Sequence, residues 1–302
     1  MTPARAAAAS LEAELQGIVV AAAAHPLTAV DLRVERRAGA AVVAGRVLTF
    51  RQAEEVRRRA AEHGAEVALE VVADPEAGLE EGWVELTAEP VDVWRAPGSA
   101  GQEHARQTQY LRGDGPLRRL GAAEGLMLVQ GADLTLGWAE PGRLAEVEPE
   151  PARAAWAGRR RVPAGEASGG VPANGLERLL ARAYVELGVP YLWGGTTHAG
   201  FDCSGLVQRV FSDALGLLLP KHTGDQRHAG GRVPFGEAAA GDLLFATPRG
   251  QRVGHVLLFT ASDRVLHACR TEGRVIEEGL GENAARYQHQ GVRRVIRAGG
   301  AS

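Results

Sequence analysis

The pattern of apolar and polar positions divides the chain into four stretches. Residues 1–78 contain helix-like and strand-like segments in the order αββαβ, which predicts a small α+β domain. Residues 79–150 contain short apolar runs separated by Gly, Pro and Asp, which is typical of a small β-barrel. Residues 151–172 are rich in Pro, Gly, Ala and Arg without periodicity, so they predict a linker.

Residues 173–302 form the longest stretch and have the clearest periodicity. Apolar residues three and four positions apart predict a helix over Leu176–Leu187, and a second helix is predicted from Cys203 to Gly216. The strand-like segments that follow are Asp242–Ala246, His255–Thr260, Val265–Cys269, Val275–Glu278 and Val292–Ile296. Helices followed by strands predict an α+β domain with an antiparallel sheet.

Composition and charge narrow the function classes. A chain of 302 residues, 45% of them hydrophobic, is large enough for two or three packed domains. Its net charge of −3 gives no general attraction to nucleic acid or anionic lipid. The Ala-rich stretch Ala6–Ala24 contains Glu12 and Glu14, which favours an amphipathic helix over an export signal. We therefore expect a cytoplasmic protein without integral membrane contact, with export to the cell envelope as the alternative.

The two cysteines, Cys203 and Cys269, differ in their sequence surroundings. One pair is too few for a disulfide scaffold. Cys269 lies on a strand pattern and is expected to be a small buried hydrophobic residue. Cys203 stands between Asp202 and Ser204 at the start of a predicted helix, where unpaired N–H groups favour a thiolate. Cys203 is therefore the candidate nucleophile.

Two histidines downstream could assist this thiol. His255 and His267 lie twelve residues apart, a gap that suits neighbouring antiparallel strands joined at residues 261–263. In such a hairpin both imidazoles can lie on one face. A thiol and an imidazole brought together by folding are the groups of a thiol peptidase. The alternative for each histidine is a hydrogen-bonded core residue.

These residues belong to a series of ordered motifs by which residues 173–302 resemble the NlpC-type cell-wall cysteine peptidases. The motifs are Pro190–Gly195, Asp202–Gly205, Leu219–Pro220, Gln226, Gly241–Phe245, Gly254–Val256 and Leu266–Ala268. The resemblance implies a papain-like domain in which Cys203 is the nucleophile and His255 is the general base. It also implies that His267 holds the His255 ring in the useful tautomer.

The resemblance further implies a set of substrate contacts. The hydroxyl of Tyr191 is expected to point at the thiol, with Trp193 nearby; the alternative is that both are core aromatics. Gly194 and Gly195 are expected to let the backbone approach the substrate closely. Thr223, in the loop after the catalytic helix, is a further candidate contact.

Asp202 and Ser204 have two competing interpretations. Relatives with a similar fused architecture use such a pair to hold the free α-amine of an N-terminal L-Ala. The alternative is that Asp202 is the N-cap of the helix, which stabilises it by about 1 kcal/mol. Both interpretations remain open at the level of the sequence.

The amino-terminal stretches carry resemblances of their own. The segment Ala41–Val72 resembles BON-type bacterial domains, and residues 79–150 resemble bacterial SH3-like domains. In the barrel, Gly125–Val129 stands where a tryptophan-bearing strand is more usual, which weakens the case for wall binding. Tyr110, in a loop of the barrel, is a candidate contact for the substrate.

The reaction implied by these resemblances is hydrolysis of the γ-D-glutamyl–diamino acid bond in peptidoglycan stem peptides. An SH3-like module before the catalytic domain favours free muropeptides that begin with L-Ala, as in cell-wall recycling. The alternatives are an exported peptidoglycan hydrolase or amidase that acts on the intact wall, and a non-enzymatic wall-binding adaptor. His198, His222 and His228 lack the spacing of metal ligands, so neither a metal nor another cofactor is expected.

Overall fold

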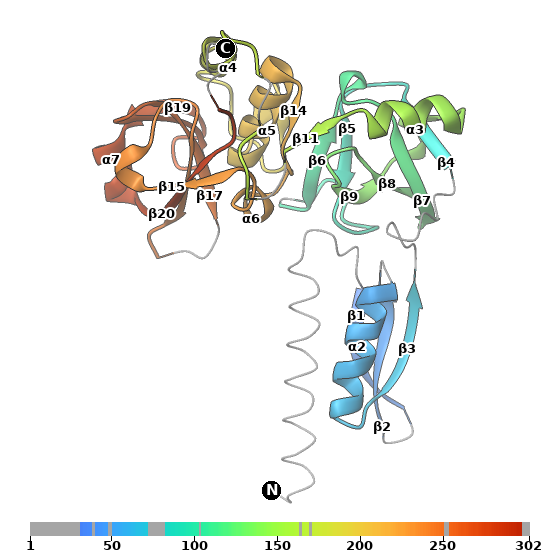
Figure 1. The fold of residues 1–302 in the computed structure, drawn as a ribbon. Helices are drawn as coiled ribbons and strands as arrows, with labels where there is room; N and C mark the ends of the chain where they lie inside the picture. The colour runs from blue at the N-terminus through green and yellow to red at the C-terminus, as the bar shows by residue number, and fades with distance from the viewer. Residues whose placement is uncertain are drawn as a thin grey trace, which may run out of the picture. The chain divides into compact units, whose positions relative to one another are not determined.

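The computed structural model shows an α+β protein whose elements are labelled in Figure 1. The residues that it describes are 31–37, 40–47, 50–71, 82–102, 104–162, 165–168, 171–250 and 254–297. The helix predicted within residues 1–30 lies outside this set. The chain divides into two compact units, and residues 154–302 belong to the second together with the short segments 108–114 and 132–134.

The first sheet has three strands in the order β1-β2-β3. Its elements are β1 (Asp31–Arg37), β2 (Ala40–Val47), α2 (Phe50–Glu62) and β3 (Glu66–Val71). β1 and β2 are antiparallel, whereas β2 and β3 are parallel and connected by α2. The helix buries a stripe of small residues with helical spacing, namely Ala53, Val56 and Ala60. The predicted ββαβ order is confirmed, and the BON-like assignment stays a prediction.

The second sheet has seven strands in the order β10-β4-β7-β8-β9-β5-β6, and the pairs from β10 through β5 are antiparallel. The strands are β4 (Gly82–Leu86), β5 (Val91–Trp94), β6 (Arg106–Tyr110), β7 (Leu117–Ala123), β8 (Leu126–Gln130), β9 (Leu136–Ala139) and β10 (Leu144–Val147). Two tryptophans and three leucines form one buried cluster, Trp94, Leu120, Leu128, Leu136 and Trp138. The prediction of short β-strands is confirmed here, and the SH3-like name stays a prediction.

The segment predicted as a linker differs from the expectation of an irregular chain. It contains α3 (Pro149–Ala157) and β11 (Arg160–Arg161), which pairs in parallel with β14 (Leu217–Leu218). Proline suits the first turn of a helix because its missing N–H has no intrahelical partner there. The alanines that follow favour the helix through their intrinsic propensity, although their apolar stripe is too narrow to give a periodic signal.

The third large sheet is antiparallel and has the order β15-β20-β16-β17-β18-β19. Its strands are β15 (Gly231–Val233), β16 (Leu243–Pro248), β17 (His255–Ala261), β18 (Arg264–Cys269), β19 (Arg274–Gly279) and β20 (Tyr287–Arg294). The helices of this unit are α4 (Gly175–Tyr184), α5 (Cys203–Leu215), α6 (Thr223–Gln226) and α7 (Leu280–Arg286). A short hairpin of β12 (Thr196–Thr197) and β13 (Gly200–Phe201) precedes α5. The α+β prediction for this domain is therefore confirmed.

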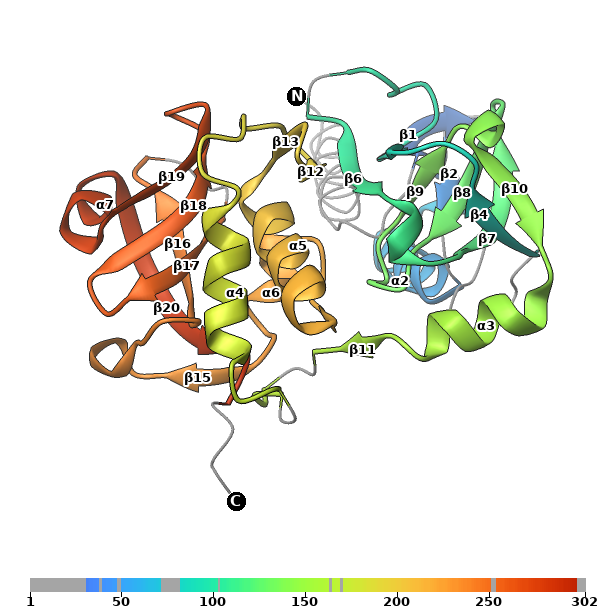
Figure 2. The same cartoon turned by 90° about the horizontal axis from the view of Figure 1, so that it is seen from above.

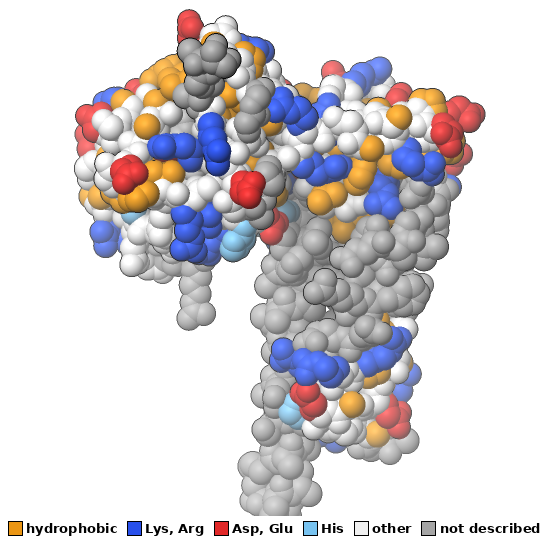
Figure 3. Space-filling model, viewed as in Figure 1, with side chains coloured by type: hydrophobic (Ala, Val, Ile, Leu, Met, Phe, Trp, Pro, Cys, Tyr) orange, Lys and Arg blue, Asp and Glu red, His pale blue; other side chains and the backbone are white. Residues whose placement is uncertain are grey.

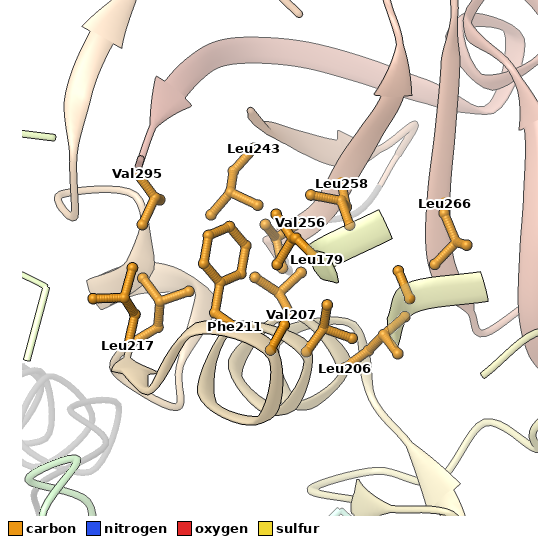
Figure 4. Close-up of a cluster of buried hydrophobic side chains, with 14 of the residues drawn as sticks. Leu179, Leu206, Val207, Phe211, Leu217, Leu243, Val256, Leu258, Leu266 and Val295 are labelled. Atoms are coloured by element: carbon orange, nitrogen blue, oxygen red, sulfur yellow. The ribbon is translucent and has the colours of Figure 1, made fainter. Parts of the chain in front are cut away.

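Both faces of this sheet are apolar, because successive side chains of its inner strands enter different clusters. In β16, Leu243 joins the cluster beneath α4 and α5, and the next residue, Leu244, joins the cluster on the other face. Figure 2 shows α4 and α5 side by side against the sheet. Figure 4 shows Phe211 of α5 among side chains of the sheet, including Leu243 and Val256. This packing fixes the helix that begins at Cys203 against the strand that begins at His255.

The surface of this unit carries charges of both signs. Figure 3 shows basic and acidic side chains interspersed on the face that it presents. Among the described residues, no helix is long and apolar enough to cross a membrane.

Candidate active site

Cys203 is the first residue of α5, and the turn before it is closely packed. Asp202 caps the helix, because its Oδ1 accepts a hydrogen bond of 2.6 Å from the N–H of Gly205. A side chain at Gly205 would not fit, since its Cβ would lie 2.0 Å from the carbonyl oxygen of Gly195. The helix ends at Gly216, whose positive φ of 64° suits glycine. The start of α5 is thereby held in one position.

The thiol of Cys203 is enclosed, with 8% of the residue exposed. Its Sγ lies 3.7 Å from Oγ1 of Thr223, at the start of α6. Burial and then the charge of Asp202 raise the pKa of Cys203, while a backbone hydrogen bond from Val256 opposes this rise. Because Val256 follows His255 in β17, the sulfur lies beside the backbone of the strand that carries the proposed base.

His255 and His267 lie on the neighbouring strands β17 and β18, joined as predicted by a turn at residues 262–263. Nε2 of His255 lies 2.7 Å from Nδ1 of His267, so the predicted meeting of the two imidazoles is confirmed. The ring of Tyr287 stacks on His255 with 4.8 Å between centroids and 12° between planes. Because Nε2 of His255 is hydrogen-bonded to His267, Nδ1 of His255 is the nitrogen that can accept the proton of the thiol.

The chain of hydrogen bonds continues beyond His267. Its Nε2 lies 2.9 Å from Oε1 of Glu278. The carboxylate of Glu278 also accepts hydrogen bonds from Asn283, at 2.7 Å, and from Arg286. The motifs in the sequence do not predict a role for Glu278, Asn283 or Arg286. The one signal in the sequence, which points to Glu278 alone, is the pair of glutamates Glu277 and Glu278 directly after two apolar residues of a predicted strand.

The charges of these groups follow from their surroundings. Burial, and then the neighbouring His267, lower the pKa of His255 well below its ordinary value. Burial also lowers the pKa of His267, which the hydrogen bond to Glu278 partly offsets. Burial would raise the pKa of Glu278, but the hydrogen bonds from His267 and Asn283 and the charge of Arg286 lower it to about 2. At neutral pH the resting site therefore holds a thiol, two neutral imidazoles and the carboxylate of Glu278.

This arrangement is suited to acyl transfer. His255 can take the proton of Cys203 as the sulfur adds to a carbonyl carbon, and can then give that proton to the leaving amine. The first N–H groups of a helix have no intrahelical acceptor, so the N–H of Cys203 is available to an oxyanion. Hydrolysis of the resulting thioester returns the thiol.

Tyr191 and Trp193 lie in the segment that leads to the catalytic helix. Burial, and then the charges of Cys203 and Asp202, raise the pKa of Tyr191, so its hydroxyl remains protonated at neutral pH. Its role at the thiol stays a prediction, and the side chain packs against the core as the alternative proposed. The guanidinium of Arg270 lies 5.9 Å from the ring centre of Trp193.

Gly194 and Gly195 were expected to approach the substrate, but the structure shows that their nearest partners are within the protein. A Cβ on Gly195 would lie 2.3 Å from the carbonyl oxygen of Gly200. The N–H of Gly194 donates a 2.9 Å hydrogen bond to Oδ2 of Asp202. Gly195 is therefore required for the close packing of the turn before Cys203, and Gly194 has a positive φ of 69°, which favours glycine.

Asp202 is also paired with Lys221, the single lysine of the chain. Nζ of Lys221 lies 2.8 Å from each carboxylate oxygen of Asp202 and 3.3 Å from Oγ of Ser204. Only 1% of Lys221 is exposed. The N-cap interpretation of Asp202 is confirmed, and the substrate-amine interpretation stays a prediction. The motifs in the sequence assign Lys221 no role, although a lone lysine among 34 basic residues is a signal that points to it.

We expect Lys221→Met to destabilise the protein by about 3–5 kcal/mol, because it leaves the carboxylate of Asp202 buried without its cation. Lys221→Arg keeps the charge and is the matched control, with a smaller expected loss. Urea unfolding of both variants measures the difference. A Lys221→Met variant as stable as the wild type would show that the pair contributes nothing to folding.

The remaining predicted contacts lie in different places. Thr223 is at the thiol, as described above. Tyr110 is buried, and its hydroxyl donates a 2.7 Å hydrogen bond to Asp133. Its substrate contact stays a prediction. Cys269 is buried and unbridged, as expected. No cluster of three His, Cys, Asp or Glu side chains suited to a metal ion occurs within the described ranges.

Comparison with known proteins agrees with the geometry of the site. Residues 188–294 match the model of the NlpC/P60 family. A peptidoglycan endopeptidase of Mycobacterium tuberculosis, RipB, is 38% identical over 135 residues, which cover 40% of this chain and 53% of that protein. The gamma-D-glutamyl-L-lysine dipeptidyl-peptidase of Bacillus subtilis is 45% identical over 93 residues, which cover 30% of this chain and 31% of that protein.

A third relative is covered more completely. A probable endopeptidase of Haemophilus influenzae is 36% identical over 112 residues, which cover 37% of this chain and 69% of that protein. The chain spans about half or less of the length of the other two relatives.

Proposed function

Because the chain belongs to the NlpC/P60 family, we propose that it is a cysteine endopeptidase that hydrolyses the γ-D-glutamyl–diamino acid bond of peptidoglycan stem peptides. The observation that carries this proposal is the site itself. A thiol begins the helix α5, and the strand β17 beside it carries a histidine that is hydrogen-bonded to a second histidine. The relatives named as endopeptidases and as a γ-D-glutamyl peptidase support the choice of bond.

The test of this proposal is cleavage of a defined peptide. The purified protein is incubated with L-Ala-γ-D-Glu-diaminopimelate, and the products are identified by mass spectrometry. We expect L-Ala-D-Glu and free diaminopimelate, with no cleavage of the isomer in which glutamate is linked through its α-carboxyl. If the γ-linked peptide remains intact under conditions where the thiol can still be alkylated, the proposed activity is wrong.

A finer proposal concerns the form of the substrate. We propose free muropeptides with an N-terminal L-Ala, hydrolysed in the cytoplasm during recycling of the wall. This is supported by the ability of Asp202 and Ser204 to hold an ammonium group, since both bond that of Lys221. A substrate amine would share the carboxylate of Asp202 with Lys221. The positive charge of that amine should therefore contribute less to binding than it would at a carboxylate without a cation.

We therefore expect acetylation of the L-Ala amine to lower kcat/KM about tenfold, the cost of one charge-assisted hydrogen bond. Free, acetylated and glycan-linked peptides are compared at equal concentration. Peptides altered in the residues beyond the scissile bond are the matched control. Equal rates on all three peptides would replace the recycling proposal with that of a hydrolase or amidase acting on the intact wall. The adaptor alternative would instead require an absence of turnover on every peptide.

A further inference from the structure

Glu278 is fixed in place by three hydrogen-bond partners. Its carboxylate is buried between β18 and α7, and accepts from His267, Asn283 and Arg286. The amide of Asn283 is itself oriented, because its Oδ1 lies 2.8 Å from Nε2 of His289. The Nδ2 of Asn283 therefore faces Glu278 as a donor. All three of these hydrogen-bond partners can donate to this carboxylate, so its surroundings favour its role as an acceptor.

We infer that Glu278 is a positioning residue that fixes the tautomer of His267 and thereby directs the proton-accepting nitrogen of His255 to the thiol. The inference rests on the proposed peptidase function and adds one member to its site. Glu278 touches neither the substrate nor the reacting atoms. Its effect is transmitted through His267.

The tautomer of each histidine follows from hydrogen-bond roles alone. An ionised carboxylate can only accept, so Nε2 of His267 must carry the proton and donate to Glu278. A neutral His267 then has a bare Nδ1, which accepts from Nε2–H of His255. A neutral His255 in turn has a bare Nδ1, which is the nitrogen that can take the thiol proton. With the opposite tautomers, that nitrogen of His255 would carry a proton and could not act as the base.

The charges around the two imidazoles are of both signs. Glu278 faces the pair from β19, Arg286 from α7 and the phenol of Tyr287 from β20. Cys203 of α5 lies beside the backbone of Val256, the residue that follows His255. The carboxylate of Glu278 favours protonation of His267, and the guanidinium of Arg286 opposes protonation of both histidines. Removing the carboxylate should therefore lower the pKa of the histidine pair, and removing the guanidinium should raise it.

Glu278→Gln and Glu277→Gln form a matched pair for the test. The side chain of Glu277, the preceding residue of β19, bonds Thr260, Tyr184 and Arg264 instead of the histidines. We expect Glu278→Gln to lower kcat about 10- to 100-fold with little change in KM, part of the roughly 10²- to 10⁴-fold that a general base contributes. The glutamine cannot satisfy both His267 and the donors around it. Glu277→Gln should stay within about twofold of the wild type.

The pH profile separates positioning from a structural effect. A lost carboxylate weakens the histidine pair as a base, so the acid limb of kcat/KM should move to lower pH in Glu278→Gln. Arg286→Gln removes the opposing charge, so its acid limb should move to higher pH. This second variant also keeps the inference testable if Glu278→Gln does not fold. Acid limbs that stay at the wild-type pH in both variants would overturn the inference.

The tautomer can be observed directly and without substrate. The imidazole nitrogens of nitrogen-15-labelled protein are recorded by NMR at neutral pH, with His267 assigned by comparison with His267→Gln. We expect a protonated Nε2 and a bare Nδ1 in the wild type and in Glu277→Gln, and a changed pattern in Glu278→Gln. A proton on Nδ1 of His267 in the wild type would overturn the inference. If the expected tautomer is found while no γ-D-glutamyl peptide is cleaved, the inference stands and the proposed function fails.

Discussion

Replacing Cys203 with Ala or Ser is expected to abolish peptide hydrolysis while the fold survives. The thiol begins α5 and lies beside the backbone of β17, the strand that carries the proposed base, so we propose it as the nucleophile. A serine hydroxyl is far less acidic, and burial has lowered the pKa of His255, so this imidazole is too weak a base to activate it. We expect kcat to fall by roughly 10³-fold or more in both variants.

The matched control for this prediction is Cys269→Ala. Cys269 is buried, and its sulfur lies 3.8 Å from the hydroxyl of Tyr287, outside the proposed reaction. This variant should keep most of the wild-type turnover, as measured by mass spectrometry on the γ-linked peptide. Near-normal turnover in Cys203→Ala, after exclusion of contaminating peptidases, would remove Cys203 as the nucleophile. Complete loss in a folded Cys269→Ala would show that the wrong thiol was chosen.

The second large effect is expected from His255→Ala. Without this imidazole the thiol has no base to take its proton, so kcat should fall by about 10²- to 10⁴-fold while KM changes little. In the wild type, protonation of His255 removes the base, so kcat/KM should fall as the pH falls through its pKa. Since burial lowers that pKa below its ordinary value, activity should persist at pH values where an exposed histidine is already protonated.

His228→Ala is the control for this experiment, because His228 is exposed in the turn after α6. It should leave both kcat and the pH profile unchanged. If His255→Ala keeps the acid limb of the wild type, another group titrates there and the assignment of the base is wrong.

Part of this site could be predicted because its determinants are local. The helix that begins at Cys203 follows from apolar spacing, and its N-cap follows from the aspartate before it. The hairpin that joins His255 to His267 follows from two apolar runs separated by a short turn. In each case the interacting residues are near one another in the chain, so their pattern is visible in the sequence.

Other features depend on contacts between distant segments. Whether a carboxylate binds a substrate amine or an internal cation depends on which side chains share its pocket, and Lys221 lies 19 residues after Asp202. The glycines before Cys203 indicate in the sequence that the backbone approaches another group closely. Only the structure shows that this group is the backbone of Gly200 in the neighbouring turn.

The sequence by itself therefore predicted the main helices and strands of the last domain, because short-range periodicity encodes them, and its motifs pointed to a candidate nucleophile with two histidines. The tertiary structure alone decided which groups complete the site. It placed Lys221 on Asp202, and Glu278 with its donors behind His267. The physical reason is that the energy of a buried charge depends on its neighbours in space, and the pairing of strands and helices brings those neighbours together from separate parts of the chain.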